Sequence, residues 1–172
     1  MKKLVCLFLA TLTSGCNLPY KAPETSNLAK VRFFSPDAVS SVYANKDDNC
    51  GGVTKLRVLG GSNGLVGMSS KDTDIGMWKI PGTKYDRDSY VEVLVAAGER
   101  FNFTIGGTAG GQCRLTASFL PKTYGQYEVN YFWAGGRCNI TISEIIREGD
   151  EVRLVNEPSG KKNEKTCTWF WN

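Results

Sequence analysis

The sequence predicts an all-β protein, an antiparallel β-sandwich held by two disulfides. Short runs rich in β-branched and aromatic residues follow one another from Val31 onward, with turn-forming residues between them. No segment has the periodicity of a convincing helix of three turns. Four cysteines lie beyond the N-terminal region, an even number that suits two bridges. A small closed β-barrel is the alternative architecture.

Ten segments have the composition and alternation expected of strands. The stretch 140–148 comes closest to a helix, but its β-branched residues and its alternation favour a strand. Two glycine-rich stretches, 60–64 and 106–111, are expected to form loops, and neither follows a phosphate-binding pattern. The predicted strands are residues 29–34, 38–44, 53–59, 75–80, 89–97, 100–106, 112–120, 126–133, 137–146 and 151–155.

The strand predicted at 100–106 has the clearest alternation in the chain. Phe101, Phe103 and Ile105 share one face, while Asn102 and Thr104 share the other. This pattern predicts a half-buried strand with its apolar face toward the core and its polar face toward water.

The phase of the cysteines indicates how they pair. Cys113 and Cys138 each alternate in phase with apolar neighbours, so both sulfur atoms are expected to point toward the core. Spacing alone allows three pairings, and this shared orientation favours Cys113 with Cys138. Cys50 with Cys167 then follows by elimination, and both bridges are expected because the N-terminal signal described next directs these cysteines to an oxidising compartment. Without histidine or a CxxC pair, the chain is not expected to bind a metal through these thiols.

The N-terminus has the three parts of a secretory signal: Lys2 and Lys3, an apolar run over residues 4–12, and small residues before Cys16. The run of about nine apolar residues is too short for a permanent membrane-spanning helix, which needs about 20. Its ending, Leu-Thr-Ser-Gly-Cys, resembles the lipobox of bacterial lipoproteins. The resemblance implies transfer of a diacylglyceryl group to the Cys16 thiol, cleavage just before Cys16, and acylation of the new amine.

The resemblance gives the chain a predicted organisation in three parts: a lipoprotein signal peptide at 1–15, a lipidated tether at 16–27 and a single sandwich domain at 28–172. Two or three acyl chains anchor a protein stably, so the lipid on Cys16 makes the membrane a partner. In lipoproteins an Asp after the lipidated cysteine tends to retain the protein at the inner membrane. Here that residue is Asn17, which favours the outer membrane, facing the periplasm.

Residues 124–129, around the start of the strand predicted at 126–133, resemble the tyrosine corner of immunoglobulin-like sandwiches, with Tyr127 as the corner residue. The resemblance implies that the Tyr127 hydroxyl bonds back to upstream backbone. The family pattern has a cysteine two positions later, where this chain has Val129, so the likeness extends to sandwich architecture only. The predicted fold is therefore immunoglobulin-like or transthyretin-like, although a plain hairpin explains the segment almost as well.

The composition argues against an enzyme. The chain has no histidine, which excludes the serine and cysteine triads built on that base. Without Lys2 and Lys3, 19 basic and 17 acidic side chains leave a net charge of +2, so no nucleic-acid partner is expected, and no motif indicates a cofactor. Pairs of carboxylates are the remaining candidates for catalysis, and all are expected to be solvated in turns: Asp47 with Asp48, Asp72 with Asp74, and Asp86 with Asp88.

Aromatic side chains form the candidate binding surface, namely Trp133, Trp169 and Trp171. The favoured interpretation of Trp133 and Trp78 is that both fill the sandwich. If Cys167 is bridged, the aromatic tail after it is expected to be a final strand that covers the core or an edge. The basic stretch 161–165 is expected to be a solvated loop.

Anchor and fold together predict an envelope lipoprotein whose non-enzymatic sandwich binds another envelope protein. The alternative is a module that binds glycan or peptidoglycan through exposed Trp and Tyr rings, or that shields the cell wall from a lysozyme.

Overall fold

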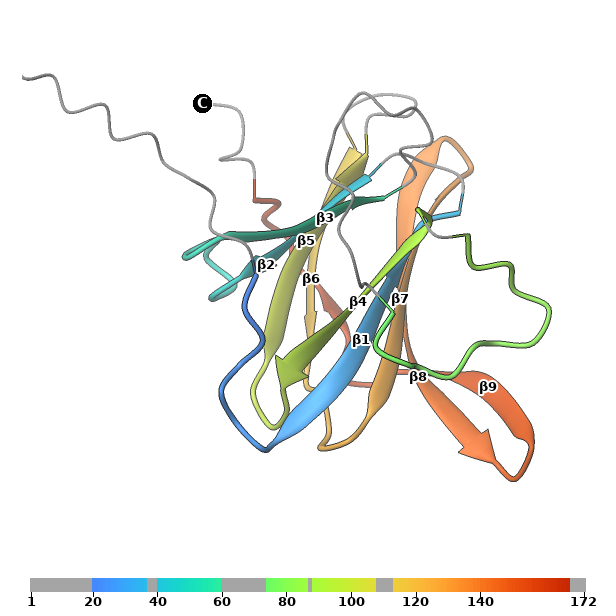
Figure 1. Ribbon diagram of the computed structural model, residues 1–172. Helices are drawn as coiled ribbons and strands as arrows, with labels where there is room; N and C mark the ends of the chain where they lie inside the picture. Colours follow the sequence, from blue (N-terminus) through green and yellow to red (C-terminus); the bar gives the residue numbers. More distant parts are fainter. Residues whose placement is uncertain (1–19, 37–39, 60–73, 87, 108–112, 168–172) are drawn as a thin grey trace, which may run out of the picture.

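The computed structural model describes residues 20–36, 40–59, 74–86, 88–107 and 113–167 of the chain. Two five-stranded sheets pack face to face as a sandwich and do not close into a barrel (Figure 1). The all-β sandwich with two disulfides is therefore confirmed. In the described part of the chain, no helix is long and apolar enough to cross a bilayer. The boundaries predicted at 15 and 16 fall outside the described residues and stay predictions.

The first sheet has the order β4-β1-β7-β8-β9, and the second has the order β10-β6-β5-β2-β3. The strands of the first sheet are β1 (Leu28–Phe34), β4 (Tyr90–Ala96), β7 (Gln126–Ala134), β8 (Arg137–Glu148) and β9 (Glu151–Asn156). Those of the second are β2 (Ser40–Asn45), β3 (Thr54–Leu59), β5 (Phe101–Gly107), β6 (Cys113–Phe119) and β10 (Lys161–Lys162).

Alternate residues of both sheets meet in one apolar core. Phe33 of β1 lies near its centre, fully buried, with its ring centroid 5.1 Å from that of Phe103 on β5 in an edge-to-face arrangement. Between β7 and β8 a two-residue turn, Gly135 and Gly136, has positive φ at both positions, as such hairpins require. Glycine adopts this conformation at no steric cost, so the turn fixes the register of the longest hairpin.

Two expectations about the strands are wrong. Residues 75–80 join no sheet: Gly76 has a φ of 73°, and the N–H groups of Ile75 and Trp78 donate to side chains instead of to a neighbouring strand. The basic stretch is not wholly a loop, because Lys161–Lys162 form β10 against β6. In addition, β1 and β7 run parallel, whereas the other pairs of described strands are antiparallel.

The polar face of β5 is buried, so the expectation of a half-buried strand is also wrong. Asn102 is 6% exposed and Thr104 is 1% exposed. The chain after β9 crosses this outer face: the backbone N–H of Asn163 donates to the Thr116 carbonyl (2.8 Å), and that of Cys167 donates to Thr116 Oγ1 (3.0 Å). A layer of hydroxyl and amide groups is therefore covered by the C-terminal segment, residues 157–167.

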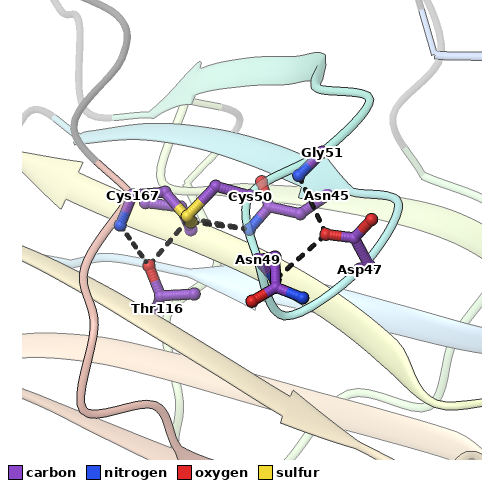
Figure 2. The surroundings of a disulfide bond; sticks show 8 residues. Asn45, Asp47, Asn49, Cys50, Gly51, Thr116 and Cys167 are labelled. Atoms are coloured by element: carbon purple, nitrogen blue, oxygen red, sulfur yellow. Dashed lines mark hydrogen bonds between the residues drawn. A yellow bond between two sulfur atoms is a disulfide. The ribbon is translucent and has the colours of Figure 1, made fainter.

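Both predicted disulfides are present. Cys113 and Cys138 join β6 to β8 across the core, with their Cα atoms 6.1 Å apart. Cys50, in the turn after β2, joins Cys167 with a Cα separation of 5.5 Å and fixes the C-terminal segment over the polar layer (Figure 2). The aromatic tail after Cys167, which was expected to form a final strand, lies outside the described residues, so this expectation stays a prediction.

Tyr127 has the contact expected of a tyrosine corner. Its hydroxyl accepts a hydrogen bond from the backbone N–H of Lys122, five residues upstream, at 2.9 Å. The ring is fully buried beside Phe119, and burial raises the pKa of the Tyr127 hydroxyl above its ordinary value. The corner therefore fixes the connection between β6 and β7, and with it the passage from one sheet to the other.

Candidate functional site

The most unusual chemistry in the structure is a buried ion cluster on the outer face of the first sheet. Arg32 of the central strand β1 lies opposite Glu92 on β4 and opposite Glu128 on β7. All three side chains are buried, at 0%, 4% and 3% exposure for the whole residues. Charged groups are rarely buried so completely unless they are paired. Removal of one partner would leave a buried charge without compensation and would destabilise the fold.

All three nitrogens of the Arg32 guanidinium donate hydrogen bonds. Its Nε and one terminal nitrogen donate to Glu92 Oε1 at 2.9 and 2.7 Å, and the other terminal nitrogen donates to Glu128 Oε2 at 3.2 Å. That second nitrogen also donates to the Trp78 carbonyl at 3.0 Å. Burial alone would lower the pKa of Arg32, but the hydrogen bond and charge of Glu92, together with the hydrogen bond to Glu128, raise it above its ordinary value.

An irregular segment, residues 74–86, covers the cluster, and we call it the strap (bright green in Figure 1). Glu92 Oε2 accepts hydrogen bonds from the backbone N–H groups of Ile75 (2.7 Å) and Met77 (3.4 Å). The Tyr85 hydroxyl donates to Glu128 Oε2 at 2.6 Å, and its ring centroid lies 4.4 Å from the Arg32 guanidinium carbon. The backbone of the strap therefore forms hydrogen bonds with side chains of the cluster and not with a neighbouring strand.

This arrangement fits a structural role and not a catalytic one. The two carboxylates of the cluster both bond to Arg32, and neither is open to a substrate. The sequence reasoning missed the cluster. The available signal was that Arg32, Glu92 and Glu128 each lie between two apolar residues of a strand, but the segment that covers them comes from elsewhere in the chain.

Raising the pH is expected to loosen the strap. Burial, together with the hydrogen bond and charge of Glu128, raises the pKa of Tyr85 above its ordinary value of about 10. The stabilisation is therefore complete below about pH 10 and is lost as the pH rises through the raised pKa. Urea unfolding at neutral and strongly alkaline pH should show a smaller alkaline loss in Tyr85→Phe than in the unmodified chain. Tyr124→Phe, at an 82% exposed position, is the control; identical profiles for both variants would contradict this account.

The carboxylate pairs considered from the sequence are not brought together as a site. Asp47 Oδ1 accepts the N–H groups of Asn49 and Gly51 and shapes the turn that carries Cys50 (Figure 2). The carboxylate of Asp74 accepts from the Gly76 N–H and the Tyr90 hydroxyl, and its hydrogen bond to that N–H holds its pKa below the ordinary range.

Asp86 pairs with Lys84, and Asp48 is exposed. Asp88 lies in the turn before β4, and Asp72 falls outside the described residues. Among the residues that the structure describes, no three acidic, cysteine or histidine side chains converge to hold a metal ion.

The tryptophans do not fill the sandwich as the favoured interpretation had it: Trp78 is 37% exposed and Trp133 is 42% exposed. The N–H of Trp78 bonds to Gln126 at the start of β7, whereas Trp133 lies seven positions further along that strand. At about 3.3 Å per residue this separates them by roughly 23 Å, too far for one stacking platform. Trp169 and Trp171 lie outside the described residues, as does Cys16.

The described surface has one open strand edge that protrudes from the sandwich, on β9. Among the described strands β9 pairs with β8 alone, none of its residues is buried, and the hairpin extends away from the body (Figure 1). Leu154, in the middle of β9, is 40% exposed. No protein-family model, no curated protein and no solved structure matches the chain.

Proposed function

We propose that the chain is an envelope-anchored lipoprotein whose sandwich, without catalytic activity, binds another envelope protein. The observation that carries the proposal is the joint presence of Cys16, at the end of a lipobox-like signal, and a domain closed by two disulfides. The two disulfides indicate an oxidising compartment outside the cytoplasm, where such a signal would deliver the domain. The lipid on Cys16 would hold the domain at a membrane.

The open edge of β9 is the surface we assign to the partner. The backbone N–H of Glu157 donates to the Ile142 carbonyl, which sets the alternation of the β8–β9 ladder. The N–H and C=O groups of Val152, Leu154 and Asn156 then point away from β8 and have no strand partner among the described residues. An extended segment of another protein can add to such an edge, taking main-chain hydrogen bonds and covering Leu154.

Charged side chains protect this edge against non-specific pairing with strands of other proteins. Arg153 pairs with Glu148 at 2.9 Å, and Arg147 pairs with Asp150 at 3.9 Å, all near the tip of the hairpin. Charges on an edge strand are a common protection against aggregation. A partner must therefore place its own strand between these charges, which favours a specific protein over adventitious association.

The alternative function, binding to a cell-wall glycan, is supported by one observation, the exposed indole of Trp133. A sugar ring can stack on such an indole, but strong binding uses more than one ring or adds polar contacts. Since Trp78 is too far away to supply the second ring, this function is the weaker candidate.

Photocrosslinking in intact cells tests the proposal. A photoreactive residue at Leu154 is expected to crosslink to an envelope protein identified by mass spectrometry. The same residue at Leu120, a leucine of similar exposure (42%, against 40% for Leu154) on the β6–β7 connection, is the matched control. Val152→Pro should abolish the crosslink and leave the fold intact, because it removes an outward N–H from an edge strand that tolerates proline.

Equal crosslinking from both leucines would contradict the docking edge, and crosslinks to glycan from position 133 would favour the alternative. The anchor is tested separately. Cys16→Ser is expected to lose palmitate label and to leave the membrane fraction, and a Cys16→Ser chain that still takes up label would refute the lipoprotein assignment.

A further inference from the structure

The start of the described chain is fixed along the β4 edge of the first sheet. The Tyr20 hydroxyl donates to the Leu94 carbonyl of β4 at 2.7 Å, and burial raises the pKa of that hydroxyl to about 12. The Asn27 carbonyl accepts from the Ala97 N–H at 2.9 Å, and the Asn27 side-chain amide donates to the Ala97 carbonyl, also at 2.9 Å. Part of the predicted tether therefore lies on the domain and adds no free length.

Only four peptide units separate Cys16 from Tyr20. A chain reaches at most about 3.6 Å per residue, so Tyr20 cannot lie more than roughly 14 Å from Cys16, whatever the conformation between them. A lipid on Cys16 would therefore bring the β4 edge close to the bilayer surface.

β9 lies at the opposite edge of the same sheet, with β1, β7 and β8 between it and β4. Four strand spacings of about 4.8 Å separate the two edges by roughly 19 Å. Figure 1 shows the start of the described chain and the β8–β9 hairpin on opposite flanks of the sandwich. When one flank is held at a membrane, the other must point away from it.

The β4 flank has groups suited to lipid headgroups. A cleft of about 240 Å³ is lined by residues that include Tyr20, Lys46 and Arg100. A half-buried tyrosine and exposed cations suit the region of lipid phosphates. Glu99 in the same cleft offsets part of this charge, so the short covalent connection, and not electrostatic attraction, sets the orientation.

We propose that the β4 flank, with the cleft around Tyr20, Lys46 and Arg100, lies against the bilayer and that the β9 edge faces away from it. This orientation rests on the proposed lipidation of Cys16. It assigns one occupant to the cleft, the phospholipid surface, and keeps the opposite edge free for a protein partner.

Fluorescence quenching on the full lipidated chain tests the orientation. Lys46→Cys and Arg153→Cys each replace an exposed cation, one on each flank, and each carries an environment-sensitive fluorophore. The vesicles contain phosphatidylethanolamine, phosphatidylglycerol and a lipid with a nitroxide on its headgroup. Strong quenching is expected at position 46 and little at 153. A Gly/Ser spacer of about 12 residues after Asn17, with an r.m.s. length of about 20 Å, should abolish the difference.

Equal quenching at the two positions on chains whose mass includes the lipid would overturn the orientation and leave the proposed function standing. A difference that persists with the spacer would show that the short connection does not set the orientation, and would overturn the argument in the same way. Chains whose mass lacks the lipid would overturn the orientation and the proposed function together.

Discussion

Arg32→Met is expected to destabilise the fold by about 3–5 kcal/mol, the cost of removing one partner from a buried ion pair. Methionine fills much of the space but leaves the carboxylates of Glu92 and Glu128 facing each other without a cation between them. The Trp78 carbonyl also loses its donor, so the strap loosens with the cluster. Urea unfolding should show a large fall in the midpoint, and amide exchange should show early loss of protection in the strap.

The control for this variant is Arg153→Met, which removes an exposed arginine from its pair with Glu148. Exposed pairs contribute about 0–1 kcal/mol, so this substitution should change the midpoint little. Comparable losses in the two variants would show that Arg32 behaves as a surface charge and would contradict the buried cluster.

Removing the Cys50–Cys167 disulfide by replacing both residues with alanine should cost up to about 5 kcal/mol. The bond closes a loop with a sequence separation of 117, and long loops restrict the unfolded chain most. In the folded state it also fixes the C-terminal segment over the polar groups of Asn45, Thr104 and Thr116. Amide exchange in β5 and β6 should therefore rise before the whole domain unfolds.

The matched comparison is the Cys113→Ala, Cys138→Ala double variant, whose bond has a sequence separation of only 25. The same chain-entropy model gives about 3 kcal/mol for a loop of this length. The variant without the Cys50–Cys167 bond should thus show the larger fall in urea midpoint. Of the two variants, it alone should show early amide exchange in the C-terminal segment. The reverse order would mean that the C-terminal segment adds little to the stability of the fold.

Local patterns predicted the parts of the fold that depend on side-chain direction along one strand. Alternation placed Cys113 and Cys138 on core-facing sides, and the structure joins them across the core. The resemblance to a tyrosine corner implied that Tyr127, near the start of its strand, bonds to upstream backbone, and this bond is present at Lys122. The cysteine prediction holds because side-chain direction alternates with a period of two in any strand, whatever its neighbours.

The failures share a cause, because each needed a partner from a distant part of the chain. Residues 75–80 look like a strand, but Glu92 and Gln126 offer their backbone other acceptors. The polar face of β5 looks solvated, but the C-terminal segment covers it. The open edge on β9 could not be found either, since a strand's place at an edge depends on the order of strands in the sheet.

The sequence by itself determined the all-β class, the inward direction of two cysteines and a lipobox-like signal, because each depends only on residues that are adjacent or that alternate along one segment. Only the tertiary structure decided which charges are buried, which strand edge stays open and which flank carries the chain from the N-terminus. Whether a residue is buried depends on which other segments pack against it. Arg32 is covered by a segment more than 40 positions away, and no periodicity in β1 could indicate it.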